Sequence, residues 1–172
     1  MGAMHHLLVV DDERAICEVI KAGFEASGSY RVRCATNKHD AVAALRHRPF
    51  DLALIDIVMR ENAGSDVEAL AGELRVPVLR MTGHPDVICK SFDQGVPVLA
   101  KPFRIGDVIG AVDQLLADAE RLQRDLAQSM SVGRALRSKS RTGLAATPLE
   151  WGEAAVQWHR LCARVLKDPR TR

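Results

Sequence analysis

Residues 7–13 read Leu7-Leu8-Val9-Val10-Asp11-Asp12-Glu13, an apolar run that ends abruptly in three acids. Four successive Leu and Val residues are typical of a strand that is buried on both faces, as in a parallel sheet. The acids then fall at the carboxyl end of the strand, which is the edge where parallel sheets collect their ligands. This stretch therefore predicts both the class of sheet and the edge that carries the chemistry.

The same alternation of short apolar runs and helical patterns continues through the first 128 residues. Apolar strand patterns recur four more times, over residues 30–35, 52–55, 77–81 and 97–100. Helical spacing fills the intervals, over residues 13–26, from a cap at Asn37, from a cap at Ser65 to Leu74, over 86–93 with a stop at Gly95, and from Arg104 onward. Five βα units in series predict an α/β fold with a doubly wound, five-stranded parallel sheet, followed by a C-terminal helical extension.

The composition is that of a soluble globular protein, with 47% hydrophobic and 27% charged residues among 172. No apolar run approaches the roughly 18 residues that cross a bilayer, and the N-terminus lacks a secretory pattern, so we expect a cytoplasmic location and no membrane partner. The four cysteines, Cys17, Cys34, Cys89 and Cys162, form no CxxC pair. We expect them to be buried thiols rather than zinc ligands.

Polar residues follow four of the five predicted strands. They are Asp11, Asp12, Asp56, Thr82 and Lys101. Carboxylates that converge at one edge repel each other unless a cation lies among them, and Mg²⁺ prefers oxygen ligands of this kind. Lys101 can pair with an added phosphoryl group, Thr82 can donate a hydrogen bond to it, and Asp56 is the best candidate nucleophile. Each residue alone fits a helix cap, a turn or a solvated side chain, and the complete set is what indicates a site.

From about residue 5 to residue 120 the chain resembles the receiver domain of bacterial two-component response regulators, in a single-domain, chemotaxis-regulator-like form. The motifs that carry the resemblance are Leu8-Val9-Val10-Asp11-Asp12-Glu13, Asp56-Ile57-Val58-Met59 with Gly64 eight residues after the Asp, Met81-Thr82-Gly83, and Lys101-Pro102-Phe103. The resemblance implies a flavodoxin-like (βα)₅ fold with strand order 2-1-3-4-5.

The resemblance also implies the chemistry of the site. A sensor histidine kinase or a phosphotransfer protein would donate a phosphoryl group to Asp56, the phosphoacceptor, with Thr82 and Lys101 assisting. Mg²⁺ would be bound directly by Asp12, Asp56 and the backbone carbonyl of Val58, and by Asp11 largely through water. A cis peptide is expected next to Lys101. Such a domain is a switch that catalyses only its own phosphoryl transfer and slow dephosphorylation, and it is not otherwise an enzyme.

Two departures from the family pattern affect the expected switching. Arg60 stands where a Pro commonly follows the Met, and Val98 stands where the family usually carries an aromatic residue. We therefore expect activation to run through Thr82 and the backbone around residues 83–90. The resemblance further implies that Val58 and His84 flank the path of the water that hydrolyses the phosphorylated Asp, so these two residues modulate its lifetime.

The last part of the chain differs in charge from the first. Residues 1–128 hold 15 Lys and Arg against 19 Asp and Glu, whereas residues 129–172 hold 9 against 3. We expect a receiver domain over residues 4–122, an extended helix end and basic linker over 123–148, and an amphipathic helix over 149–168 that carries Trp151 and Trp158. The sequence shows no recognisable output domain after the receiver.

The role of this tail stays open at the level of sequence. Apolar spacing that continues through Leu122 and Leu126 fits either a frayed helix end or a homodimer through the last receiver helix. The Trp-bearing helix fits docking on its own receiver or on a downstream protein target. An alternative function is nucleic-acid binding by the basic tail, which we rank lower because no helix-turn-helix pattern fits there. A phosphatase is disfavoured, since no additional general base is visible.

Overall fold

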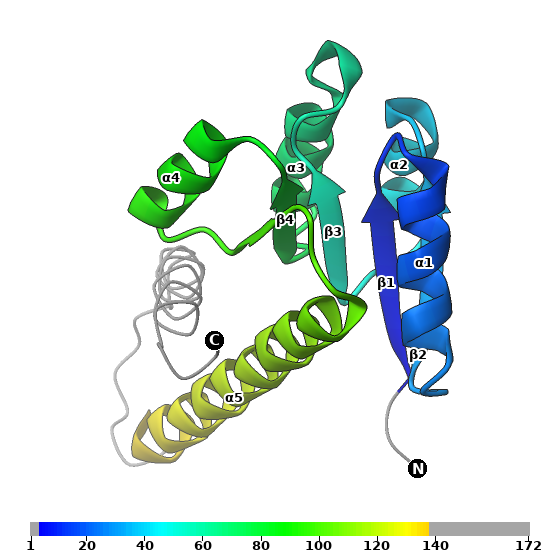
Figure 1. Cartoon of the computed structure of the whole chain (residues 1–172). Coiled ribbons are helices and arrows are strands. Elements are labelled where there is room, and N and C mark those ends of the chain that lie inside the picture. Colours follow the sequence, from blue (N-terminus) through cyan, green and yellow to red (C-terminus); the bar gives the residue numbers. More distant parts are fainter. Residues whose placement is uncertain (1–3, 138–172) are drawn as a thin grey trace.

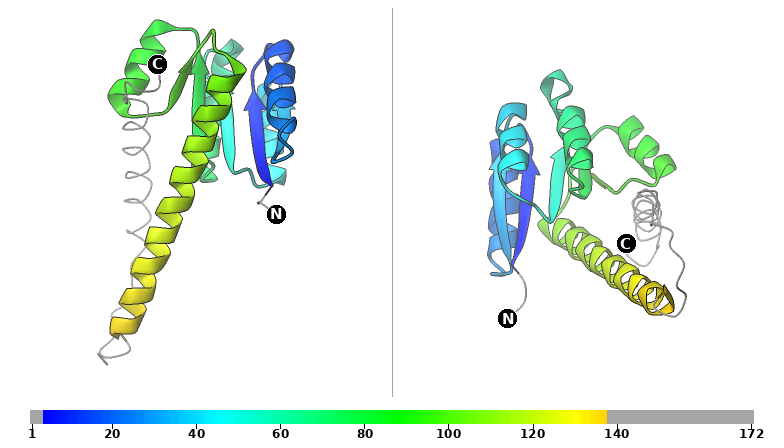
Figure 2. Two further views of the ribbon diagram at one scale, coloured as in Figure 1. Left: turned by 60° about the horizontal axis from the view of Figure 1, so that its bottom comes forward. Right: turned by 180° about the vertical axis from the view of Figure 1, so that it is seen from behind.

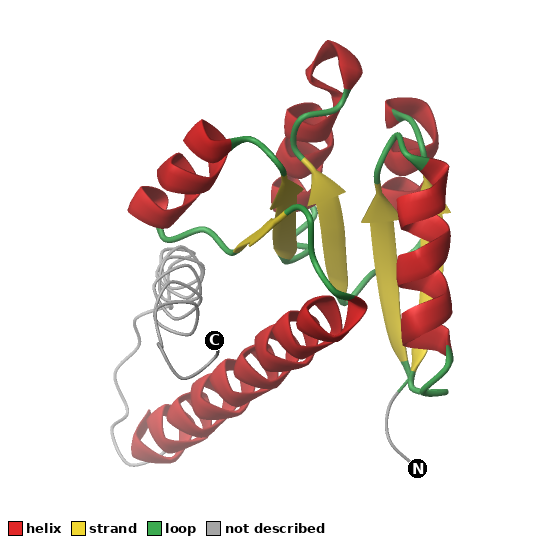
Figure 3. Ribbon diagram, viewed as in Figure 1, coloured by secondary structure: helices red, strands yellow, loops and turns green. Residues whose placement is uncertain are grey.

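The computed structural model describes residues 4–137, in which strands and helices alternate along the chain (Figure 1, Figure 3). The strands are β1 (His5–Val10), β2 (Tyr30–Ala35), β3 (Leu52–Asp56), β4 (Val78–Thr82) and β5 (Val98–Ala100). The helices are α1 (Arg14–Glu25), α2 (Lys38–His47), α3 (Ala63–Glu73), α4 (Pro85–Gln94) and α5 (Ile105–Arg137), with a short 3₁₀ turn at Arg60–Asn62.

The five strands form one parallel sheet in the order β2-β1-β3-β4-β5. This confirms the predicted doubly wound, flavodoxin-like topology. The register aligns the carboxyl ends of the central strands, because Val10 at the end of β1 pairs with both Ala35 and Ile55. Asp56 likewise pairs with Met81, so the residues that follow these strands emerge at a common edge.

The two faces of the sheet carry separate apolar clusters, which explains the uninterrupted apolar run of β1. Leu7 and Val9 pack in one cluster with α1 and α5, whereas Leu8 and Val10 pack in the other with α2 and α3. All four side chains are completely buried. A strand covered on both faces has no solvent-facing side, and it therefore shows no polar alternation.

Several helix boundaries fall where the sequence predicts them. The side chain of Asn37 accepts a hydrogen bond from the backbone amide of Asp40 and caps α2. Gly95 ends α4 in the left-handed conformation, with φ of 69°. The predicted cap at Ser65 is wrong, because α3 already begins at Ala63 and Ser65 lies inside its first turn.

The early start of α3 depends on Gly64. A Cβ atom at this position would lie 2.1 Å from the backbone oxygen of Asp56 and 2.8 Å from the Cα atom of Ile57. Only glycine allows the first turn of α3 to approach the end of β3 so closely. Gly64 therefore sets the distance between α3 and the backbone that carries Asp56.

Helix α5 continues well past the sheet and is helical as far as Arg137, the last residue that the structure describes (Figure 2). Residues 123–137, which belong to the predicted extended helix end and basic linker over 123–148, are part of α5. The rest of the predicted linker and the amphipathic helix over 149–168 lie outside the described residues, as do the side chains of Leu122 and Leu126. Within residues 4–137, no helix is long and apolar enough to span a membrane.

Candidate functional site

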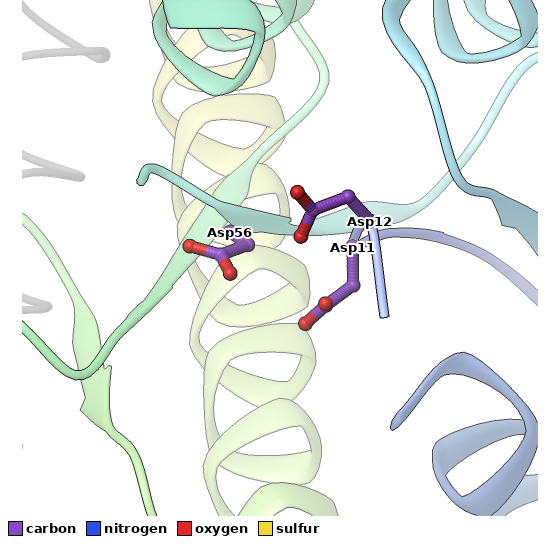
Figure 4. A group of neighbouring side chains, drawn as sticks. All are labelled: Asp11, Asp12 and Asp56. Carbon is purple, nitrogen blue, oxygen red and sulfur yellow. The ribbon is translucent and has the colours of Figure 1, made fainter. Parts of the chain in front are cut away.

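Three carboxylates meet at the carboxyl edge of the sheet. Asp11 and Asp12 follow β1 and extend toward Asp56, the last residue of β3 (Figure 4). One ligand oxygen from each of these residues lies within 4.8 Å of the others. Asp11 and Asp56 are buried, whereas Asp12 is exposed. The sequence prediction that these three acids converge is therefore correct.

Lys101 reaches the same point from the end of β5. Its Nζ atom lies 2.6 Å from Oδ2 of Asp11 and 2.7 Å from Oδ2 of Asp56. The ammonium group thus bridges the two buried carboxylates and reduces the repulsion between them. The Lys101-Pro102 peptide bond is cis, as the resemblance implied.

The site leaves its charged groups in unequal environments. Burial raises the pKa of the Asp11 carboxyl above its ordinary value, although the hydrogen bonds from Lys101 and from the Glu13 amide oppose this shift. Burial lowers the pKa of the Lys101 ammonium, but its hydrogen bonds to Asp11 and Asp56 outweigh burial, and the net pKa is raised. Lys101 is therefore firmly cationic, whereas Asp11 gains from any further positive charge.

At the carboxyl ends of three strands, a polar side chain of the site accepts a hydrogen bond from the backbone two residues later. The backbone amide of Glu13 donates to Asp11 Oδ1 at 3.0 Å, that of Val58 to Asp56 Oδ1 at 2.8 Å, and that of His84 to Thr82 Oγ1 at 3.0 Å. Each bond links a residue to the one two positions later, as Asp and Thr favour in turns. These turns orient the side chains of the site before any ligand arrives.

Neither Asp11 nor Asp12 acts as the cap of α1. The residue at that position is Glu13, whose side chain makes no capping bond. A capping role, which is the usual structural explanation for an Asp before a helix, therefore applies to neither acid. Both carboxylates remain directed at the edge of the sheet.

Thr82 and the two expected modulating residues lie around this centre. Thr82 is completely buried at the end of β4, and its carbonyl accepts the backbone amide of Lys101 at 2.8 Å. Val58 and His84 are both exposed, and the His84 imidazole lies 3.9 Å from the carboxylate of Asp86. Two exposed side chains thus stand beside the edge where the acids meet.

The sequence analysis missed two groups near the site. Arg80 of β4 pairs with Glu68 of α3 at 2.8 Å and donates to Ser91 of α4 at 2.9 Å. An arginine within an otherwise apolar strand was the available signal. The second group is Cys17 and Cys34, which contact each other next to Asp11. The prediction that the cysteines are buried is wrong for Cys89, which is exposed on α4.

Fold and site together define a doubly wound α/β protein with a lysine-bridged acidic site at the strand ends. The family model of the response regulator receiver domain matches residues 7–113, and the chain belongs to this family of two-component signalling domains.

Individual relatives agree with this assignment. The transcriptional regulatory protein ZraR of Salmonella typhimurium is 32% identical over 131 residues, which are 73% of this chain and 26% of ZraR. The response regulator SaeR of Staphylococcus aureus is 27% identical, over 74% of this chain and 58% of SaeR. The chain therefore spans only part of the length of these relatives.

Solved structures show the same architecture. A CheY-like receiver domain protein from Methanospirillum hungatei superimposes with a TM-score of 0.62 and 26% sequence identity. The match covers 69% of this chain and 98% of that structure. Residues 114–172 lie outside the range that the family model matches.

Proposed function

We propose that this chain is a phosphorylation-controlled switch that accepts a phosphoryl group on Asp56 from a histidine kinase or a phosphotransfer protein. The observation that carries the proposal is the bridging of Asp56 and Asp11 by Lys101, at 2.7 and 2.6 Å, beside the exposed Asp12. A buried nucleophile, a fixed cation and further oxygen ligands are the parts that phosphoryl transfer to a carboxylate requires.

The donor set fits Mg²⁺, which favours carboxylate and carbonyl oxygens. Asp11, Asp12, Asp56 and the backbone carbonyl of Val58 would hold the ion. Bound there, it would supply positive charge to the phosphoryl oxygens as they approach the acids. Burial raises the pKa of the Asp11 carboxyl despite the nearby Lys101, so a cation beside Asp11 would further favour its charged form.

The residues of the chain perform the transfer itself. A carboxylate oxygen of Asp56 attacks phosphorus in line with the bond to the donor imidazole nitrogen. The P–N bond breaks, its electron pair returns to the imidazole, and an acyl phosphate forms on Asp56. Lys101 then pairs with a phosphoryl oxygen, and the Thr82 hydroxyl donates a hydrogen bond to another.

The output is a change in protein contacts rather than turnover of a substrate. Because Thr82 and His84 lead directly into α4, a hydrogen bond from Thr82 to the phosphoryl group would displace the start of that helix. We propose a downstream protein as the reader of this change. We also propose that the receiver spans residues 4–122 and that the later segments form an appendage that begins on α5.

Phosphorylation at Asp56 is directly testable. Phosphoramidate with Mg²⁺ should add one acid-labile phosphoryl group per chain, and Asp56→Asn should abolish the addition because an amide oxygen is a poor nucleophile. The measurement is intact-mass spectrometry with and without Mg²⁺. Asp51→Asn is the matched control, since Asp51 lies before the opposite end of β3 and makes the same change of charge. Undiminished labelling of Asp56→Asn would reject the proposal.

A further inference from the structure

Two cysteines from different elements contact each other beside the acidic site. Cys17 lies on α1 and Cys34 lies on β2, and the Cys34 thiol donates to the Cys17 carbonyl oxygen at 3.4 Å. Cys17 Sγ in turn lies 3.5 Å from the backbone oxygen of Asp11, so both thiols point into the interface between α1 and the sheet. Each sulfur is repositioned by rotation about a single bond, Cα–Cβ, and Cys34 Sγ already contacts the backbone of Cys17.

The pair is connected to the site through Asp11. The Cys17 thiol donates to the backbone carbonyl of Asp11 at 3.5 Å. Cys34 is aligned with Val9 in the sheet, two residues before Asp11. Any reaction that consumes the Cys17 S–H group therefore removes a hydrogen bond from the residue that begins the acidic edge.

The two thiols differ in access and in reactivity. Cys34 is partly exposed, whereas Cys17 is only 1% exposed. The interaction with Cys17 lowers the pKa of the Cys34 thiol, and Lys21 acts in the same direction, against burial and the carboxylates of Glu25 and Glu18. The thiolate is the form that attacks oxidants, so Cys34 is suited to react first and Cys17 to react second.

We propose that Cys17 and Cys34 are a redox-sensitive dithiol that a peroxide converts to a disulfide, and that the disulfide weakens Mg²⁺ binding at the acidic site. The Cys34 thiolate attacks one peroxide oxygen, the O–O bond breaks, and the departing hydroxide becomes water. The Cys17 sulfur then attacks the Cys34 sulfenic sulfur, and the departing hydroxide takes the Cys17 proton. In total, two thiols and one hydrogen peroxide give one disulfide and two waters.

The coupling to the site follows from the lost hydrogen bond. In the disulfide, Cys17 can no longer donate to the Asp11 carbonyl, and α1 becomes covalently tied to β2. The loss of one such bond corresponds to a change of about fivefold in an equilibrium constant. This coupling rests on the proposed function, whereas the formation of the disulfide does not.

The bond is tested in the full chain carrying Cys89→Ser and Cys162→Ser, which leaves only the pair. Hydrogen peroxide should produce a monomer that has lost two hydrogens and resists alkylation, and a dithiol reductant should reverse the change. Peptide mapping should show Cys17 joined to Cys34. Two thiols that remain alkylatable, or a Cys34 that proceeds to sulfinic acid with Cys17 free, would overturn the proposal.

The coupling is tested by titration calorimetry with Mg²⁺ on the reduced and oxidised forms. Oxidation should weaken binding by about fivefold, which is the effect of one hydrogen bond. Cys17→Ala should show the weaker affinity without oxidant, and Cys34→Ser should keep the stronger affinity in its presence. Equal affinity of the two forms would overturn the coupling. If neither form binds Mg²⁺, the proposed function fails while the disulfide result stands.

Discussion

Helices α1 and α4 each follow a strand that delivers residues to the acidic edge, but the two helices are held to the sheet by different kinds of contact. Helix α1 buries Cys17, Ile20 and Phe24, and the Phe24 ring packs edge-on against Tyr30 at 4.9 Å. The only residue that α4 buries is Ser91, and the hydroxyl of Ser91 accepts a hydrogen bond from Arg80. Helix α1 is anchored by apolar packing, whereas the buried contact of α4 is polar.

The difference in anchoring implies a difference in mobility. Full burial of a side chain such as Ile20 or Phe24 stabilises by about 1.5–3 kcal/mol, whereas a hydrogen bond contributes about 1 kcal/mol net. Helix α4 should therefore open at lower free energy than helix α1. The fixed side of the site comprises α1, the three carboxylates at the ends of β1 and β3, and the start of α3 at Gly64. The movable side begins after β4, where Thr82 and His84 lead into α4. A receiver needs both, because capture requires fixed geometry and signalling requires an alternative state.

The largest expected effect comes from breaking the fixed side at Gly64. Gly64→Ala places a Cβ atom 2.1 Å from the Asp56 backbone oxygen, and backbone on both sides must shift to relieve the clash. We expect a loss of about 3 kcal/mol in the free energy of unfolding, at the upper end of overpacking costs, together with impaired phosphorylation. Urea denaturation is the measurement.

The matched control for this change lies in the same helix. A Cβ atom at Gly72 would meet nothing within 4 Å, and Gly72→Ala should stabilise by about 0.5–1 kcal/mol. Equal effects of the two alanines would show that α3 does not depend on close approach to β3, and the fixed side would lose its explanation.

An intermediate effect is expected from releasing the movable side. Arg80→Met removes the ion pair with Glu68 and the hydrogen bond to Ser91. The ion pair is largely shielded from solvent, because only 18% of the Arg80 side chain and 21% of the Glu68 side chain are exposed. Amide exchange in residues 85–94 should accelerate on the order of tenfold, while exchange in α1 stays unchanged. Hydrogen exchange followed by mass spectrometry separates the two helices.

An exposed ion pair between two helices provides the comparison for Arg80. Lys38 of α2 pairs with Asp66 of α3, and these side chains are 53% and 52% exposed. Lys38→Met should change exchange and stability little, because an exposed pair contributes about 0–1 kcal/mol. If amide exchange of α4 were unchanged in Arg80→Met, apolar contacts would be what holds α4 to the sheet. The contrast between helices α1 and α4 would then be mistaken.

The smallest effect concerns the lifetime of phosphorylated Asp56, and it compares one residue from each side. Val58 follows β3 on the fixed side, and His84 precedes α4 on the movable side. The Val58 side chain has no hydrogen-bonding group, and we propose that it partly blocks the path of the hydrolytic water. Val58→Asn should therefore shorten the lifetime by several-fold. His84→Ala should change the lifetime less, because its imidazole acts only on water that has already entered. The measurement is the decay of acid-labile phosphate in Mg²⁺ buffer. Equal or slower decay in Val58→Asn would show that access of water at Val58 does not limit the lifetime of phosphorylated Asp56.

The sequence by itself determined the fold class and the residues of the acidic edge. Apolar runs such as Leu7–Val10 mark strands buried on both faces, and such strands in a parallel sheet end at one edge. The polar residues that follow them must then meet, so Asp11, Asp56 and Lys101 could be placed together without coordinates. Local chemistry was equally readable at Asn37 and Gly95, where a cap depends on the residue and its immediate neighbours.

The tertiary structure alone decided which side chains from different elements meet on the faces of the sheet. Ser65 has the side chain of a typical cap, but α3 begins at Ala63, where Gly64 allows the helix to approach the backbone of Asp56. The contacts of Arg80 with Ser91 and of Cys17 with Cys34 depend on how each helix is rotated about its axis. Periodicity shows which face of a helix is apolar, but the rotation and offset of that face against the sheet are set by the packing of the whole core.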